Sequence, residues 1–253
     1  NETMLGGSGA DLIAADGGNN LVDGGSEDDF ITTAGNGVNT LSGGAGNDTV
    51  GGADGADQIS GNAGNDSLTG GLSSDIMDGG DGDDTLFAEG GDDVAVFRGG
   101  EGGGIFVAPG NGEYYDGGLG TDVLRIELSA AQYAAVGVLD ELVAMRDFIA
   151  ANANAASDVG PTFDGPVLGF SFGDFEAIEL YVNGLLIDIA APLFTPNADT
   201  VNFNTVIAGN YIDGTQYEAL ESADFVIMPN DSAAATASGY NEAGVFRAGD
   251  GND

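Results

Sequence analysis

The chain of 253 residues contains no cysteine, histidine, lysine or tryptophan. Without histidine, cysteine and lysine it lacks the side chains that most often act as general bases or activated nucleophiles. Paired carboxylates could still hydrolyse glycosides, but nearly every clustered aspartate belongs to the repeat described below, so we expect no enzymatic activity. The absence of cysteine means that disulfide bonds cannot mark or stabilise an extracellular domain here.

Positive charge is almost absent as well. Lysine and arginine together number 4, against 42 acidic residues, which gives a net charge of −38. Such a chain repels nucleic acid and anionic membrane surfaces, and it resists compaction unless cations neutralise it. No apolar run approaches the roughly 18 residues of a membrane span. We therefore predict bound cations, no nucleic-acid partner and no transmembrane segment.

Glycine, with 46 residues, is abundant and follows a nine-residue repeat, as in GGAGNDTVG (43–51), GNAGNDSLT (61–69) and GGDGDDTLF (79–87). Glycine favours the first, second and fourth places, the sixth place is always Asp or Asn, and the eighth is apolar. One unit has a tenth residue, which we assign to Thr33. The units begin at residues 6, 15, 24, 34, 43, 52, 61, 70, 79 and 88.

This pattern predicts a flattened coil. A glycine-rich turn of about six residues and an extended segment of about three make half a coil, so two units complete one coil and the apolar residues stack from coil to coil. The alternative is a disordered acidic linker. A linker would not keep an apolar residue in one column through ten units, so we expect disorder only when cations are absent.

The sixth-place side chains predict the kind of cation. Residues 18 positions apart lie at the same corner of successive coils, so two carboxylates and several carbonyl groups face one gap. These ligands are hard oxygens on flexible turns, which suits Ca²⁺ with its six to eight oxygen ligands better than Mg²⁺ with its stricter octahedral geometry.

The pattern GGxGxDxUx, in which U is a large apolar residue, resembles the nonapeptide of the RTX (repeats-in-toxin) family. The resemblance is strong over residues 6–96 and weak over 97–128. It implies a mainly β fold, a parallel β-roll with calcium between successive turns. It also implies a bacterial protein that is exported by a type I secretion system and folds outside the cell.

Carried over to this chain, the family pattern gives two ladders of sixth-place residues with up to about eight calcium ions. One ladder holds Asp11, Asp29, Asp48, Asp66 and Asp84, and the other holds Asn20, Asn39, Asp57, Asp75 and Asp93, with Asp122 as a further ligand. The glycine ligands are predicted at Gly44, Gly46, Gly64, Gly80 and Gly82. The gap between Asn20 and Asn39 has no carboxylate and is the weakest candidate.

Three parts are predicted. Residues 1–128 form the roll, including a glycine-rich loop at 97–118 and a degenerate unit at 117–125. Residues 129–199 form a cap: a helix over 130–155, begun by Ser129 and interrupted near Gly137, then a hairpin that turns at Asn183-Gly184. Residues 200–253 form a β-rich connector. It contains strands within 199–209 and 223–229, a short helix at 232–240, and a final AGDGND (248–253) that resembles the start of another unit.

The function predicted from these features is that of a calcium-dependent structural segment of a secreted or cell-surface protein, such as an adhesin, surface-layer or filament subunit. Self-association or contact with neighbouring copies fits this role. Tyr114, Tyr115 and Tyr217 are candidate contacts for a glycan or another surface ligand. The alternative is the export and folding module of a secreted hydrolase or toxin, because the same nonapeptides occur in those proteins.

Overall fold

The computed structural model describes residues 1–98, 113–133, 135, 137–154, 160–187, 200–202, 217–218, 225–227 and 246–247. These residues fall into two compact units. The first unit comprises Asn1–Glu127 and Asp140–Glu179, and the second comprises Leu128–Leu139 and Leu180–Asp253. Among the described residues, no helix is both long and apolar enough to cross a bilayer.

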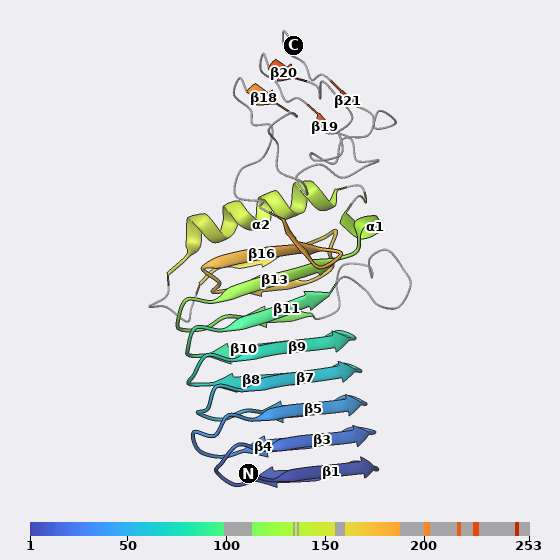
Figure 1. Ribbon diagram of the computed structural model, residues 1–253, viewed down its shortest axis with the longest axis vertical. Coiled ribbons are helices and arrows are strands. Elements are labelled where there is room, and N and C mark those ends of the chain that lie inside the picture. The colour runs from blue at the N-terminus through green and yellow to red at the C-terminus, as the bar shows by residue number, and fades with distance from the viewer. Residues whose placement is uncertain are drawn as a thin grey trace. The chain divides into compact units, whose positions relative to one another are not determined.

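The first unit is a parallel β-roll, as predicted, in which successive strands alternate between two sheets (Figure 1). The first sheet is built from β1 (Thr3–Ser8), β3 (Leu21–Ser26), β5 (Thr40–Ala45), β7 (Gln58–Ala63), β9 (Ile76–Asp81), β11 (Val94–Arg98), β13 (Val123–Leu128) and β16 (Ala177–Val182). The second is built from β2 (Leu12–Ala15), β4 (Phe30–Thr33), β6 (Thr49–Gly51), β8 (Ser67–Gly71), β10 (Thr85–Glu89), β12 (Tyr114–Asp116), β15 (Ser171–Gly173) and the antiparallel β14 (Thr162–Asp164).

The core of the roll is the predicted apolar column. Ile59 pairs with Met77 in the first sheet and Val50 with Leu68 in the second, so each eighth-place side chain stacks on its counterpart one coil away. All four are at most 2% exposed. Each unit therefore contributes one apolar side chain to a narrow core, and the stack supplies the burial that no unit has alone.

Two details of the register correct the sequence analysis. Thr33 pairs with Ala15 within the β2–β4 ladder, so the additional residue lies in the turn that follows and is not Thr33. The array also begins earlier than residue 6, because Met4 pairs with Val22 in β1. Residues 1–5 thus supply the last places of a further unit.

The prediction of a loop over residues 97–118 is wrong at both ends of this range, where the structure has strands. Phe97 and Arg98 continue β11 and pair with Ile126 and Glu127, and Tyr114–Asp116 forms β12 beside β10. Residues 99–112 lie outside the described part of the chain. The degenerate unit behaves as predicted, since Leu124 pairs with Ala95 in the apolar column.

Aromatic side chains and a helix close the stack. Phe97 stacks on Phe170 with ring centroids 4.1 Å apart. α2 (Val138–Asn152) lies beyond β13 and β16 at this end of the roll (Figure 1), and its Phe148 contacts Phe163 of β14 and Phe172 of β15. The predicted helix cap is thus observed, and it packs on the last strands of the second sheet.

The second unit begins with a capped helical turn. Ser129 and Gln132 exchange hydrogen bonds at the start of α1 (Ala130–Tyr133), which is a capping box. Gly137, with φ of 88°, separates α1 from α2 at the predicted break. The predicted hairpin is also present: β16 pairs antiparallel with β17 (Leu185–Ile187), and Asn183 and Gly184 turn the chain with φ of 50° and 76°.

Short strands follow in the second unit. They are β18 (Thr200–Asn202), which pairs with β20 (Phe225–Ile227), and β19 (Tyr217–Glu218), which pairs with β21 (Phe246–Arg247). β18 and β20 lie within the two stretches predicted as strands. The predicted helix at 232–240 and the repeat-like residues 248–253 lie outside the described residues, and the boundaries of the three predicted parts remain predictions.

Candidate metal centre

The sixth-place side chains form two ladders, one at the entrance to each sheet. In each ladder one carboxylate oxygen accepts a hydrogen bond from the backbone N–H of the equivalent residue in the preceding coil. Asp48 N–H donates to Asp66 Oδ1, and Asp57 N–H donates to Asp75 Oδ1, both over 2.7 Å. Asp11 is half-buried, while the side chains of the following aspartates are almost completely buried, with exposures of 0–3% for Asp29, Asp48, Asp57, Asp66, Asp75, Asp84, Asp93 and Asp122.

The second oxygen of each of these aspartates is buried and has no hydrogen-bond partner. This holds for Oδ2 of Asp11, Asp29, Asp48, Asp57, Asp66, Asp75, Asp84, Asp93 and Asp122. A buried polar atom without a partner costs about 1–3 kcal/mol, and more when it carries charge. A regular column of such atoms on two edges of the roll indicates that a partner from outside the chain completes them.

Glycines in the first place of most units leave room beside these oxygens. A Cβ placed on Gly70 would lie 2.5 Å from Asp75 Oδ2 and 2.9 Å from the carbonyl oxygen of Ala88 in the next coil. On Gly52 it would lie 2.5 Å from Asp57 Oδ2 and 2.7 Å from the Gly70 carbonyl oxygen. A carboxylate and a carbonyl oxygen therefore approach one point. Sequence analysis took these glycines for turn residues and missed their place at the site.

The glycines that were predicted as ligands have a different position. Gly44, Gly46, Gly64, Gly80 and Gly82 all have positive φ, between 101° and 143°, and a Cβ on any of them would collide with a carbonyl of the preceding coil. They allow consecutive turns to approach closely and so bring the carbonyl groups of the corner together. The atoms nearest to such a Cβ are those carbonyls and not the sixth-place carboxylates, and the assignment of these glycines as calcium ligands stays a prediction.

Burial changes the acidity of the ladders. The pKa of Asp66, Asp75 and Asp122 is raised to about 7, mainly by burial and also by neighbouring carboxylates, against the opposing effect of the backbone hydrogen bonds that these aspartates accept. Burial likewise raises the pKa of Asp84 and Asp93 to about 6. The negative charge is thus disfavoured in the roll unless a cation accompanies it.

The donor set fits calcium. Each gap between two aspartates offers carboxylate oxygens and backbone carbonyls, without nitrogen or sulfur, and such oxygen sites are typical of Ca²⁺. Among the described residues, no group of three or more acidic, histidine or cysteine side chains is placed so that the side chains alone could hold a metal ion. Backbone carbonyls would therefore have to complete the coordination. When bound, calcium would supply the positive charge that the paired aspartates lack.

The ladder before the first sheet is longer than predicted. Glu2 N–H donates to Asn20 Oδ1 over 2.9 Å, and Asp122 N–H donates to Glu176 Oε2 over 2.9 Å. Asp122 lies in the ladder where the degenerate unit placed it. Glu2 and Glu176 were missed: Glu2 precedes the first full unit, and Glu176 is 54 residues from Asp122, without a nonapeptide around it.

The asparagines occupy the ladder in a different way. Asn39 Oδ1 accepts a hydrogen bond from Asn20 N–H over 3.0 Å, as an aspartate oxygen would. Its amide nitrogen, however, donates hydrogen bonds within the site, and the same is true of Asn20. Asn39 was predicted as a ligand. The structure places it in the ladder as a hydrogen-bond donor with its second side-chain atom satisfied.

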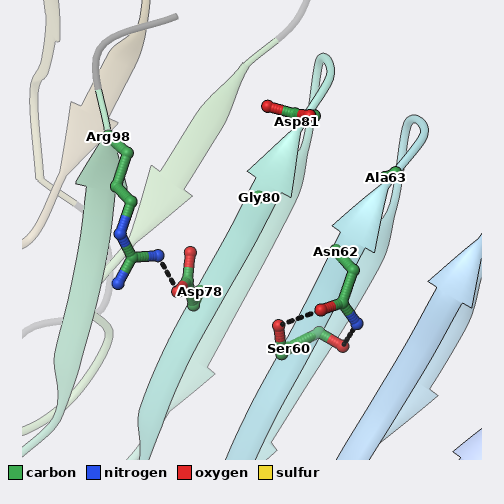
Figure 2. A pocket seen from close by; sticks show the side chains of 7 residues that line it. All are labelled: Ser60, Asn62, Ala63, Asp78, Gly80, Asp81 and Arg98. Atoms are coloured by element: carbon green, nitrogen blue, oxygen red, sulfur yellow. Dashed lines mark hydrogen bonds and ion pairs between the residues drawn. The ribbon is translucent and has the colours of Figure 1, made fainter. Parts of the chain in front are cut away.

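A separate polar pocket of about 390 Å³ lies on the outer face of the first sheet. Figure 2 shows Arg98 reaching from β11 to Asp78 on β9, with Ser60 and Asn62 beside each other on β7. None of these side chains belongs to the ladders. This pocket is distinct from the metal centre.

The tyrosines predicted to contact a glycan are placed differently from one another. Tyr115 is 1% exposed and donates a hydrogen bond to Glu113, so it cannot present its ring to a ligand, and this part of the prediction is wrong. Tyr114 packs edge-on against Phe87 with ring centroids 6.2 Å apart. The side chain of Tyr217 lies outside the described part of the structure.

Comparison with family models identifies the array. The model of the RTX calcium-binding nonapeptide repeat matches the chain in four copies, over residues 1–31, 33–68, 60–95 and 69–102. No curated protein and no solved structure matched the chain. The matched copies confirm the resemblance drawn from the sequence.

Proposed function

We propose that this chain, whose residues 1–102 carry RTX calcium-binding nonapeptide repeats, is a calcium-dependent structural segment of a secreted or cell-surface protein. One observation supports the proposal above all others: two columns of buried aspartates have a regularly unpartnered oxygen. Such columns are costly alone and become favourable when a divalent cation lies between coils. The roll is thus a fold that needs an external ion.

The same residues would make folding a switch. With 42 acidic side chains and 4 basic ones, the chain repels itself when calcium is scarce, and an unfolded chain suits export through a secretion channel. Outside the cell, the aspartates of successive coils would hold the ion, and the apolar column would then stack. Extracellular calcium modules bind with Kd of about 10⁻⁴–10⁻³ M, so folding would follow the change in calcium between the two sides of the membrane.

Within this proposal the segment has an architectural role, as part of an adhesin, surface layer or filament, with neighbouring copies as partners. The acidic side chains of the ladders recur with the nonapeptide, and they accept hydrogen bonds from backbone N–H groups of the neighbouring coil. We assign them to ion binding and propose no catalytic function. Type I export and an extracellular location belong to the same proposal, because RTX repeats typically occur in secreted proteins.

A calcium titration at neutral pH tests the proposal. Far-ultraviolet circular dichroism of the chelated protein should show little β structure, which should appear on adding calcium and disappear on renewed chelation. Magnesium at the same concentration should not replace calcium. An Asp66→Ala/Asp84→Ala variant should need more calcium, whereas Asp23→Ala, which changes an exposed carboxylate of β3, should need about the same amount. β structure that persists through complete chelation at neutral pH would contradict the proposal.

A further inference from the structure

Asn20 and Asn39 differ from the aspartates in the atom that faces the gap. The nitrogen of Asn20 donates to the carbonyl oxygens of Asp16 and Gly18 over 2.8 and 3.0 Å, and to Asn39 Oδ1 over 3.2 Å. The nitrogen of Asn39 donates to the Gly37 carbonyl over 3.0 Å and to Asp57 Oδ1 over 2.9 Å. In these two units an amide NH₂ group thus donates hydrogen bonds to the oxygens of the corner. In the aspartate units the same place is taken by a carboxylate oxygen without a partner.

A second side chain completes this arrangement at the gap between Asn39 and Asp57. The hydroxyl of Thr33 donates a hydrogen bond to the carbonyl oxygen of Gly52. In the next gap of the same ladder, the corresponding carbonyl of Gly70 lies beside the unpartnered Asp57 Oδ2. Thr33 therefore gives the Gly52 carbonyl a hydrogen-bond partner, whereas the equivalent Gly70 carbonyl lies near an unpartnered carboxylate oxygen. The Thr33 hydroxyl also accepts a hydrogen bond from Asn39 Nδ2 over 3.4 Å.

The residue in the first place of a unit differs between the units that have Asn in the sixth place and those that have Asp there. In the register of the structure, Ala15 and Thr33 precede Asn20 and Asn39, whereas glycine precedes the aspartates, with Ala88 before Asp93 as the exception. Glycine is the residue that leaves space beside the second carboxylate oxygen, as Gly52 and Gly70 show. Thus the two asparagine units lack both the carboxylate and the space that accompanies it.

We infer that the gaps at Asn20 and Asn39 are closed by amide and hydroxyl hydrogen bonds in place of a calcium ion, and that ions enter only the gaps between acidic residues. The amide carries no charge, so it adds no repulsion to the ladder, and its two N–H donors satisfy carbonyls that would otherwise bind the ion. The ladder before the first sheet then begins with rungs that need no cation, and its first ion lies between Asp57 and Asp75. This inference rests on the proposed calcium-dependent function.

The test converts one amide rung into an acidic one. A Thr33→Gly/Asn39→Asp variant restores both the carboxylate and the space beside it, and it should bind one calcium ion more than the wild type, counted by native mass spectrometry and by isothermal titration calorimetry. Asn47→Asp is the matched control and should leave the number of bound ions unchanged. It adds the same charge at an exposed side chain, and its oxygen can still accept the hydrogen bond from the Asn65 N–H.

A second pair of variants decides the question if the first does not fold. Asp57→Asn and Asp57→Ala both remove a ligand and should each bind one ion fewer than the wild type. The amide can still donate to the carbonyls of the corner, so Asp57→Asn should fold at about the wild-type calcium concentration and Asp57→Ala at a concentration at least about tenfold higher, or 1.4 kcal/mol.

Three results overturn the inference: the Thr33→Gly/Asn39→Asp variant binds the wild-type number of ions, Asn47→Asp gains an ion as well, or Asp57→Asn and Asp57→Ala require equal calcium. Failure of the proposed function is recognised separately, because the wild type would then bind no calcium at all.

Discussion

The repeat array (residues 1–98) and the closing segment (residues 113–127 and 140–179) continue the same two sheets but are stabilised by different means. In the array each unit buries one apolar side chain and one sixth-place side chain, and nearly all of the latter are aspartates with an unpartnered oxygen. In the closing segment the core is aromatic, with Tyr115, Phe170 and Phe172 at most 2% exposed. Coil geometry alone therefore does not decide how a coil is stabilised.

Charge is also treated differently in the two regions. In the closing segment, Glu141 accepts hydrogen bonds from the N–H groups of Val167 and Leu168 over 2.6 and 2.8 Å, and Arg125 pairs with Glu179 over 3.0 Å. Glu141 and Glu179 thus have partners within the chain, whereas Asp122, which continues the ladder into this segment, keeps an unpartnered oxygen. In the proposed function the array takes its positive charge from solution, so we expect dependence on calcium to vary along one continuous roll.

The largest effect expected from this comparison is a difference in hydrogen exchange after chelation. At neutral pH without calcium, backbone amides of β3 to β10 should lose almost all protection, because unpaired buried charge opposes stacking. Amides of α2 and β16 should lose less, because aromatic burial and internal hydrogen bonds remain. Hydrogen–deuterium exchange with mass spectrometry, read for peptides of both regions with and without calcium, measures the difference. Equal loss in the two regions would show that they form one cooperative unit.

Acid should partly replace calcium in the array. Burial raises the pKa of Asp66 and Asp75 from 3.8 to about 7, so the folded roll binds protons that the unfolded chain releases. The stability of the calcium-free array is then fully present below about pH 4 and is lost as pH rises through 7. We expect the chelated protein to show more β structure at pH 5 than at pH 8. The measurement is circular dichroism, with light scattering to exclude aggregation.

The control for this prediction removes the responsible carboxylates. Asp66→Asn/Asp75→Asn should have a smaller pH dependence than the wild type, whereas Asp23→Asn, at an exposed position of β3, should keep it. A calcium-free protein with less β structure at pH 5 than at pH 8 would contradict the assignment, because deprotonated aspartates would then favour the roll.

Sequence alone predicted the parts of this structure that repeat at fixed spacing. The coil of two units, the acidic ladders, the apolar column and the Asn183-Gly184 hairpin all follow from local patterns. Glu176 could not be found in this way, because it joins Asp122 only through a strand pairing across 54 residues. Thr33 was misassigned for a related reason. Counting residues locates an insertion only approximately, and the pairing of Thr33 with Ala15 shows that the additional residue comes after the strand.

A smaller effect is expected when a methyl group fills the space beside the carboxylates. Gly70→Ala would place a methyl group 2.5 Å from Asp75 Oδ2 and 2.9 Å from the Ala88 carbonyl oxygen, so the corner must widen. We expect the calcium concentration at half-folding to rise by about tenfold, equivalent to about 1.4 kcal/mol. Gly51→Ala is the control, because its nearest atom would lie 4.0 Å away, and it should have little effect. Equal midpoints for both variants would mean that the corner has no need of glycine.

The smallest effect is expected at the seam between the two regions, where Arg98 of β11 pairs with Asp78 of β9 and with Glu127 of β13. The Arg98 and Glu127 side chains are 35% and 36% exposed, and ion pairs of this kind contribute about 0–1 kcal/mol. Arg98→Gln should therefore lower the free energy of unfolding in saturating calcium by at most about 1 kcal/mol, and salt should reduce the difference.

Arg146→Gln, which alters the pair with the exposed Asp147 on α2, is the matched control in the closing segment. Denaturant titration at two salt concentrations measures both. A loss above about 2 kcal/mol, or a changed number of bound calcium ions, would mean that the array also relies on an internal cation and would weaken the contrast between the two regions.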